Sequence, residues 1–268
     1  MAENIPKAVQ QALLEIEQMD IKEEVADPYK IFITGSTTGV GLLAAKYLLK
    51  QGHHVVVHAR NVGRAEDVRA VLGGELPVVI GDLAQTAEVK EMARALNQMG
   101  TFDVVIHNAG IGSSKDILLV NVLAPYILTC LMHKPQQLIY TSSDMHSGGS
   151  LRFNSILDGK GVSYSDSKLL LQTLASLLAR RWQGKVLVNT VDPGWVPTRM
   201  SGGSAPDDLH QAYGSYIYLI EQMQQGAQPT GSYYYHSKLV KATPASADKL
   251  NQARLAEVLE EVTGVTLN

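Results

Sequence analysis

The sequence predicts one α/β domain built on a doubly wound, seven-stranded parallel sheet. Short apolar runs alternate with segments of helical periodicity along most of the 268 residues. These runs are continuous, as expected for parallel strands that helices cover on both faces. Glycine, serine, asparagine and aspartate collect where the runs end, and ligands of such sheets bind at the carboxyl ends of the strands. The chain length suits a single large domain.

Residues 1–28 are expected to form a helical extension ahead of the domain at residues 29–268. Apolar residues recur there at helical spacing among glutamates, which predicts an amphipathic acidic helix ended by the Asp27–Pro28 pair. Two roles stay open, packing on the domain surface and contact with a partner, and the first is favoured. The apolar residues are Val9, Ala12, Leu13, Ile16 and Met19, and the glutamates are Glu15, Glu17, Glu23 and Glu24.

The first strand, the turn after it and the next helix predict an anion site. Lys30–Thr34 is a buried strand, a glycine-rich turn follows, and Leu42–Gln51 has helical periodicity. Glycines let the main chain approach a ligand closely, and a helix N-terminus offers free N–H groups to a pyrophosphate. Glycine spacing alone also occurs in ordinary loops, so the strand and helix on either side carry the prediction. The candidate binding residues are Gly35, Ser36, Thr37, Gly39, Val40 and Gly41.

The end of the second strand, His54–His58, bears on the choice of nucleotide. No acidic residue stands where NAD-binding proteins place one for the ribose hydroxyls; Arg60 follows instead, and Arg64 lies one helical turn further on. A guanidinium suits a 2′-phosphate, which favours NADP(H) over NAD(H). The alternative is that both arginines are solvated charges at a helix start.

The remaining elements continue the alternation. Further strands are expected at Leu76–Ile80, Val104–His107, Gln137–Thr141, Val186–Val191 and Ser232–His236. Further helices are expected at Val62–Leu72, Thr86–Met99, Ile117–Met132, Ser163–Trp182, Asp207–Gln224 and Ala247–Thr263.

Tyr164 and Lys168 form the chemical centre of the prediction. Their spacing puts the phenol and the ammonium on one face of a helix. A free tyrosine has a pKa of about 10, and a nearby Lys⁺ lowers it, which makes Tyr164 a workable general acid/base. Ser142 or Ser143, at a strand end, can hydrogen-bond a substrate carbonyl, and Asn121 is expected to hold a water near Lys168. A tyrosine and a lysine at this spacing also occur by chance on helix surfaces.

Together these motifs resemble the short-chain dehydrogenase/reductase family over residues 30–236. The resemblance implies a Rossmann-like fold and hydride transfer between a nicotinamide and a carbonyl/alcohol pair. It implies that Ser143 rather than Ser142 is the catalytic serine. It also implies that Asp82 and Leu83 contact the adenine. The motifs are Thr34-Gly35-x-x-x-Gly39-x-Gly41, Asp82-Leu83, Asn108-Ala109-Gly110, Asn121, Ser142-Ser143, Tyr164-x-x-x-Lys168 and Pro193-Gly194-x-x-x-Thr198.

Other roles follow from the same resemblance. Asn108 is expected to support the cofactor-binding core, and Pro193, Gly194 and Thr198 are expected near the nicotinamide. The segment between Ser143 and Tyr164 is longer than in compact members and resembles the retinol-dehydrogenase-like branch. The resemblance further implies possible homo-oligomers through the helices near Asn121 and Tyr164, although the segment before Asn121 is short.

Within the longer segment, His146 is expected to be a structural loop residue rather than a substrate contact. The segment Trp195–Gly214 is expected to form a lid whose apolar residues favour an apolar carbonyl or alcohol substrate.

Composition excludes several other classes. A net charge of −3 without a Lys/Arg cluster argues against nucleic-acid binding, and no apolar run approaches the length of a membrane span. The single cysteine, Cys130, and the lack of a signal pattern favour the cytoplasm, and no histidine spacing suggests a metal. Two alternatives to an NADP-dependent oxidoreductase remain, an NADPH-binding redox sensor without turnover and a nucleotide-sugar epimerase.

Overall fold

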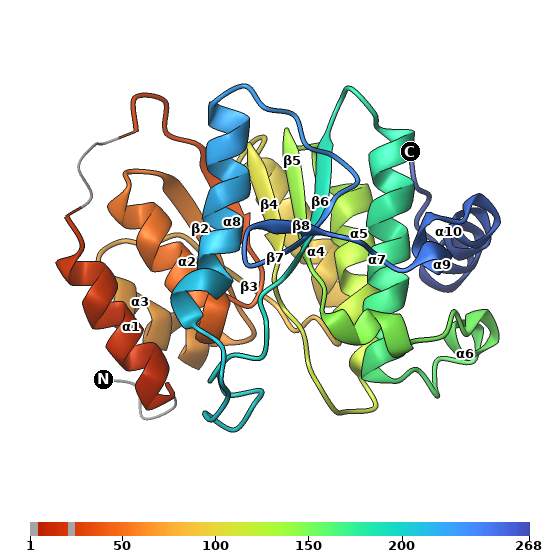
Figure 1. The fold of residues 1–268 in the computed structure, drawn as a ribbon, viewed down its shortest axis with the longest axis horizontal. Helices are drawn as coiled ribbons and strands as arrows, with labels where there is room; N and C mark the ends of the chain where they lie inside the picture. The colour runs from red at the N-terminus through yellow and green to blue at the C-terminus, as the bar shows by residue number, and fades with distance from the viewer. Residues whose placement is uncertain (1–4, 21–24) are drawn as a thin grey trace.

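The computed structural model describes residues 5–20 and 25–268, which form one eight-stranded sheet with helices on both faces (Figure 1). The strand order is β3-β2-β1-β4-β5-β6-β7-β8, with neighbouring strands parallel from β3 to β7. The order reverses between β1 and β4, so the predicted doubly wound, Rossmann-like architecture is confirmed. The strands are β1 (Lys30–Ile33), β2 (His54–Ala59), β3 (Val78–Ile80), β4 (Val104–His107), β5 (Gln137–Thr141), β6 (Leu187–Asp192), β7 (Tyr233–Tyr235) and β8 (Lys238–Val240).

The strand count differs from the prediction by one. β8 pairs antiparallel with β7 at the edge of the sheet, so seven parallel strands carry one short antiparallel addition. The turn between them places His236 at φ 45° and Ser237 at φ 62°. A two-residue hairpin normally signals itself by glycine or asparagine at such positions, and neither is present.

Helices line both faces of the sheet. They are α1 (Lys7–Gln18), α2 (Gly39–Lys50), α3 (Val62–Leu72), α4 (Thr86–Gln98), the π-helical turn η1 (Leu119–Leu123), α5 (Ala124–Leu131), the 3-10 helix η2 (Asp144–Gly148), α6 (Phe153–Leu157), α7 (Tyr164–Arg181), α8 (Leu209–Gln224), α9 (Pro244–Ala247) and α10 (Lys249–Thr263). None of the helices in the described part of the chain combines the length and apolar character needed to span a bilayer.

The strand side chains alternate between two apolar cores. In β1, Phe32 points into the core shared with α4, α5, α7 and α10, whereas Ile31 and Ile33 point into the core shared with α1, α2 and α8. Val56 and Val105, which pair with Phe32 on either side, lie in the first core as well. This period-two alternation fixes the register of the sheet, because a one-residue shift would exchange the two faces.

The N-terminal helix α1 packs on the domain. Its residues Val9, Ala12 and Ile16 are buried in the core formed with α2 and α8, beside which it lies in Figure 1. It ends at Gln18, where Met19 takes an extended ψ of 129°, and not at the Asp27–Pro28 pair as predicted. Residues 21–24, with Glu23 and Glu24, lie outside the described residues.

The predicted helix Ile117–Met132 is interrupted by the π-helical turn η1, which contains Asn121. Pro125 supplies the physical reason. Proline has no N–H, so it cannot donate the α-helical hydrogen bond to the carbonyl of Asn121 four residues earlier. The helix therefore takes the wider π-helical form over Leu119–Leu123, and the α-helix resumes at Ala124.

Candidate active site

The predicted functional residues gather where the strands end. The turn after β1, the segments after β4, β5 and β6, and the first turn of α7 all meet at the carboxyl edge of the sheet. This is the edge where doubly wound sheets bind ligands, next to the reversal of strand order between β1 and β4.

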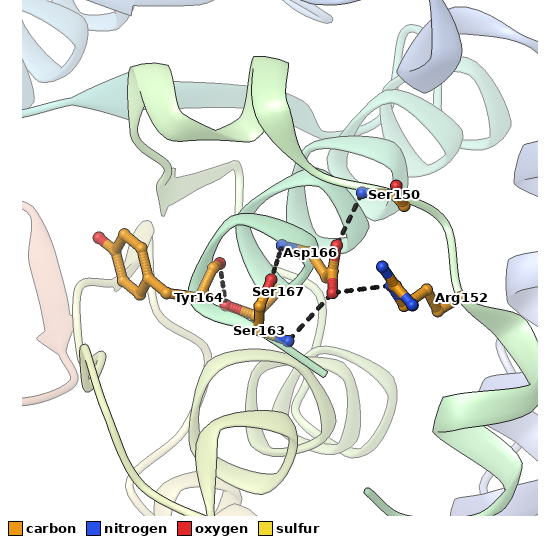
Figure 2. A network of polar contacts seen from close by, with 6 residues as sticks. All are labelled: Ser150, Arg152, Ser163, Tyr164, Asp166 and Ser167. Atoms are coloured by element: carbon orange, nitrogen blue, oxygen red, sulfur yellow. Dashed lines mark hydrogen bonds and ion pairs between the residues drawn. The ribbon is translucent and has the colours of Figure 1, made fainter. Parts of the chain in front are cut away.

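The start of α7 is fixed by a network of hydrogen bonds. The Ser163 hydroxyl accepts from the Asp166 N–H at 3.1 Å, and Asp166 Oδ2 accepts from the Ser163 N–H at 3.0 Å, which together form a capping box. Asp166 also accepts from the Ser150 N–H at 2.7 Å and pairs with Arg152 Nε at 3.3 Å. Figure 2 shows the Tyr164 ring pointing away from this network, so the cap anchors the helix and leaves the phenol free.

The buried Asp166 remains a carboxylate. Burial alone would raise its pKa, but the hydrogen bonds from the N–H groups of Ser163 and Ser150 outweigh it, and the pKa of Asp166 is lowered. The long segment before α7 is therefore tied to the helix start by an ionised side chain.

Tyr164, Lys168 and Ser143 come together as predicted. Lys168 Nζ lies 5.4 Å from the centre of the Tyr164 ring and donates to the Thr141 carbonyl at 2.7 Å. Ser143 is the hydroxyl that acts on the ionisation of Tyr164, whereas Ser142 is buried and its N–H donates to the Val191 carbonyl.

The ionisation of the tyrosine differs from the prediction. Burial raises the pKa of Tyr164 to about 12; Ser143 offsets this in part, and the charges of Asp192 and Asp144 add to it. The spacing to Lys168 predicted a lowered tyrosine pKa; in the structure the pKa of Tyr164 is raised instead, with burial as the largest cause. Burial also lowers the pKa of Lys168 to about 8, against the opposing effect of Asp192.

Asn121 lies beside Lys168, but its side chain is already engaged. Its Oδ1 accepts from the Ile111 N–H at 2.9 Å, and its Nδ2 donates to the Ile111 carbonyl and the Ser167 hydroxyl, both at 3.0 Å. A Cβ on Gly110 would lie 3.5 Å from both Asn121 Oδ1 and Lys168 Nζ, so the glycine keeps space open between them.

The glycine turn rests on the Asn108–Ala109 segment. Gly35 has φ +64°, and a Cβ there would lie 2.8 Å from Ala109 Cα. Asn108 Nδ2 donates to the Thr34 and Gly35 carbonyls at 2.9 and 3.2 Å, and the Ala109 N–H donates to the Thr34 hydroxyl at 3.0 Å. A Cβ on Gly41 would overlap the Asn108 amide. Asn108 thus supports the turn in the way the resemblance implied.

Ser36 and Thr37, the two hydroxyl residues of the turn that were predicted to bind a ligand, have different environments in the structure. The Ser36 hydroxyl is buried, donates to the Ile33 carbonyl at 2.8 Å and accepts from the His58 N–H at 2.9 Å, so it is used within the fold. Thr37 is half-buried. α2 begins at Gly39, three residues before the predicted Leu42, so Gly39, Val40 and Gly41 form its first turn.

His58 is a residue of this edge that sequence reasoning missed. Its Nδ1 accepts from the Gly35 N–H at 3.0 Å, and its Nε2 lies 2.8 Å from the Gly81 carbonyl, to which it donates. Burial lowers the pKa of His58, so the ring is neutral and one tautomer links the ends of β1, β2 and β3. Only its position at a strand end hinted at this role.

The predicted nucleotide residues lie beyond His58. Arg60 is exposed at the end of β2, while Arg64 Nη1 lies 3.5 Å from an Asp67 carboxylate oxygen. Asp82 Oδ1 accepts from the Ala84 N–H at 2.9 Å, and Leu83 is buried. Of the two arginines, Arg60 is therefore the better placed to meet a phosphate.

The segment after β6 closes the other side. Gly194 has φ +81°, and a Cβ there would collide with Asp207 and His236. A Cβ on Gly39 would lie 3.3 Å from Thr198 Cγ2, so the segment containing Pro193 and Thr198 reaches the start of α2. The predicted nicotinamide residues thus face the glycine turn.

A cavity of about 510 Å³ opens beside Asp144, the residue after Ser143. Three carboxylates and two tyrosines line it, together with apolar residues that include Trp195 and Val240. Of the lid residues, Trp195 is 65% and Met200 54% exposed, whereas Val196, Leu209 and Tyr213 are buried core residues. The lining residues are Asp144, His146, Ser147, Asp192, Gly194, Trp195, Asp207, Tyr233, Tyr235, Val240, Lys241, Ala242 and Thr243.

His146 makes contacts within the fold and also lines this cavity. Its Nδ1 lies 2.6 Å from the Ser143 carbonyl, its Nε2 accepts from the Thr243 N–H at 3.2 Å, and its ring packs edge-on against Tyr233. Cys130 is partly buried in α5, and burial raises the pKa of its thiol to about 12. An unreactive thiol of this kind fits a packing role.

Comparison with known proteins agrees with this geometry. The family model for short chain dehydrogenases matches residues 29–125. The chain is 40% identical over 250 residues to an uncharacterized oxidoreductase of Emericella nidulans, covering 88% of this chain and 97% of that protein. It is 34% identical to the short-chain dehydrogenase chyC of Penicillium rubens, covering 89% and 98%. The chain belongs to the short-chain dehydrogenase family. The chain is also 29% identical to human retinol dehydrogenase 14, covering 63% of this chain and 62% of that protein.

Solved structures share the fold of this dehydrogenase. A Shigella flexneri protein described as a short chain dehydrogenase, complexed with NADP, superposes with a TM-score of 0.65 at 20% identity, covering 81% of this chain and 100% of that one. A 3-ketoacyl-(acyl-carrier-protein) reductase from Brucella melitensis, complexed with NADH, gives a TM-score of 0.62 at 20% identity, covering 77% and 96%.

Proposed function

We propose that the protein is an NADP(H)-dependent oxidoreductase that interconverts a carbonyl and an alcohol, with Tyr164 as general acid/base. The observation that carries this proposal is the meeting of Tyr164, Lys168 and Ser143 at the carboxyl edge of the sheet. A protein that only bound the nucleotide would have no use for a buried lysine beneath a half-buried phenol.

The donor set at the sheet edge fits a dinucleotide. The first N–H groups of α2, at Gly39, Val40 and Gly41, have no acceptor within the helix and suit a pyrophosphate. The exposed guanidinium of Arg60 suits a 2′-phosphate. Since relatives in fold have been solved with either NADP or NADH, the choice of NADP(H) depends on Arg60.

The side chains then divide the chemistry. The nicotinamide, when bound, supplies or accepts the hydride. Ser143 and Tyr164 donate hydrogen bonds to the substrate oxygen, and Tyr164 transfers its proton to that oxygen during reduction. Because burial raises its pKa to about 12, Tyr164 is protonated at neutral pH and suited to this step. Lys168 stabilises the phenolate that remains after this transfer. Asn121 fixes the π-helical turn η1 beside Lys168 through hydrogen bonds with Ile111 and Ser167.

The experiment that tests this proposal follows NADPH consumption by the purified protein with a panel of ketones and aldehydes, alongside fluorescence titrations with NADPH and NADH. Tyr164→Phe is expected to lower kcat by about 10²- to 10⁴-fold while NADPH still binds. Normal turnover by this variant would contradict the role of Tyr164. Binding of NADPH without turnover of any carbonyl or alcohol would favour a redox sensor.

A further inference from the structure

Asp192, the last residue of β6, is a buried carboxylate with three hydrogen-bond donors around it. It is 3% exposed. Its Oδ2 accepts from the Asp144 N–H at 2.7 Å and from the Tyr233 hydroxyl at 3.1 Å, and its Oδ1 accepts from the Gly194 N–H at 2.8 Å. Hydrogen bonds from three donors offset the cost of burying this carboxylate.

The three donors belong to three different walls of the site. Asp144 follows the catalytic serine, Gly194 follows β6 on the nicotinamide side, and Tyr233 belongs to β7. The main chain around Ser143 is held from both sides by the end of β6, since the Ser142 N–H donates to the Val191 carbonyl at 2.7 Å. The Asp192 carboxylate therefore joins the main chain after Ser143 to the Gly194 turn, in addition to the bond between Ser142 and Val191.

The same carboxylate acts on Tyr164 and Lys168 of α7. Its charge raises the pKa of Lys168 against the lowering effect of burial, and it adds to the raised pKa of Tyr164. Other titratable groups lie around Asp192. Asp144 comes from η2, Tyr216 from α8, and Tyr233 and Tyr235 from β7. Asp207 and His236 lie next to Gly194, and the His146 ring packs on Tyr233. Among these groups, Asp192 is the carboxylate that acts on Lys168.

We propose that Asp192 is a positioning residue, which fixes the Ser143 segment against the Gly194 turn and holds a negative charge toward the Tyr164–Lys168 pair. This proposal rests on the proposed oxidoreductase function. The charge maintains Lys168 as an ammonium and Tyr164 as a phenol, the forms that carbonyl reduction requires. Without the charge, both groups lose their protons at lower pH.

The direct test is an NMR titration of lysine side chains labelled with ¹³C, in which the Lys168 resonance is the one missing from Lys168→Met. The Lys168 midpoint is expected at about 8 in the wild-type protein. In Asp192→Asn it should fall by at least about one pH unit. Coinciding midpoints would overturn the charge role. This readout does not need turnover, so it is separate from the test of the proposed function.

The kinetic test compares Asp192→Asn with Asp207→Asn. Asp207 lines the same cavity and likewise accepts from a main-chain N–H, that of Trp195 at 2.7 Å, and from a tyrosine hydroxyl, that of Tyr235 at 3.4 Å. In Asp192→Asn the alkaline limb of kcat/KM for carbonyl reduction should move to lower pH; in Asp207→Asn the limb should keep its position. A loss in Asp192→Asn that is equal at every pH would indicate a purely structural role.

Tyr233→Phe separates positioning from charge and covers the case in which Asp192→Asn does not fold. It removes one donor and keeps the carboxylate. We expect kcat to fall about 10- to 100-fold, in line with the loss of one hydrogen bond to a charged group, while the alkaline limb and NADPH affinity stay in place. An unchanged kcat in this variant would overturn the positioning role.

Discussion

The two halves of the sheet edge hold their polar groups in different ways. At the ends of β1, β2 and β3, neutral side chains form hydrogen bonds with the main chain. They are the imidazole of His58, the hydroxyl of Ser36 and the amide of Asn108. At the ends of β5 and β6 and the start of α7, buried charged side chains form the corresponding hydrogen bonds with the main chain. They are Asp166, Lys168 and Asp192.

This difference matches two functions, nucleotide binding and proton transfer. A dinucleotide is recognised by main-chain N–H groups, which need only be held in place, and neutral partners suffice for that. Proton transfer needs groups whose ionisation is adjusted, and nearby buried charges adjust it. Changes in the nucleotide half should therefore act on cofactor affinity, whereas changes in the catalytic half should act on kcat and on its pH dependence.

The largest effect is expected from Lys168→Met in the catalytic half. Removing the ammonium beneath Tyr164 should lower kcat by about 10²- to 10⁴-fold, the range for loss of acid–base catalysis, with a much smaller change in NADPH affinity. Steady-state kinetics and NADPH titration measure both quantities. Lys185→Met, at an exposed position, is the matched control. A loss of NADPH affinity as large as the loss of kcat would break the division between the halves.

His58→Leu should show the reverse pattern. The variant leaves the Gly35 N–H and the Gly81 carbonyl without their partner, at a cost of about 1–3 kcal/mol each, so NADPH affinity should fall at least about tenfold. His53→Leu is the control, because His53 Nδ1 accepts from the Tyr29 N–H at 3.0 Å at the opposite end of β2. Urea unfolding should show both variants destabilised, with only His58→Leu weak in NADPH binding. Equal NADPH affinity in the two variants would contradict the role of His58.

Acid should weaken the fold through the same two histidines. Burial lowers the pKa of both His53 and His58, so below about pH 6.5 the unfolded chain takes up protons that the folded chain does not. The free energy of unfolding should therefore decrease as the pH falls through this range, by up to about 1.4 kcal/mol per pH unit for each histidine. Urea unfolding at pH values from 7 to 5 measures the slope, and His53→Leu should reduce it.

An effect confined to NADPH binding is expected from Arg60→Ala. The loss of charge-assisted hydrogen bonds of about 1.5–3 kcal/mol should weaken NADPH binding by about 10- to 100-fold and leave NADH binding unchanged. Paired fluorescence titrations with the two nucleotides provide the test. An NADH preference already present in the wild-type protein would mean that Arg60 is an ordinary surface charge.

The smallest effect is expected from Arg152→Ala. The guanidinium pairs with Asp166, but its side chain is 58% exposed, so the pair should contribute only about 0.2–1 kcal/mol to the free energy of unfolding. Thermal unfolding should show a small decrease, with kcat nearly unchanged because Ser163 and Ser150 still hold Asp166. A large loss of kcat would mean that Arg152 helps to position Tyr164.

The sequence predicted the features that depend on local pattern. Apolar runs located every parallel strand, and the glycine turn, Asn108, Ser143 and Tyr164 were placed correctly at the sheet edge. Features that depend on the tertiary environment were missed. The pKa of Tyr164 is set by burial, which spacing to Lys168 does not reveal, and His58 stands in a strand that otherwise looks like apolar filler.

Two misses had different causes. The π-helical turn at Asn121 had a signal in the sequence, because Pro125 four residues later cannot complete an α-helical hydrogen bond. β8 had none, because its three residues are exposed and the turn before it lacks the usual glycine or asparagine.

The packing of α7 has a consequence for the order in which the protein folds. Of its 18 residues, 13 are buried, and α10 packs along it, with Arg180 bonded to Gln252 and Trp182 to Asn268. The helix that carries Tyr164 and Lys168 therefore completes its packing only with residues that lie more than 70 positions further along the chain. During synthesis the apolar surface of α7 that packs on α10 stays exposed until those residues have left the ribosome. Contacts between such distant residues form late in folding.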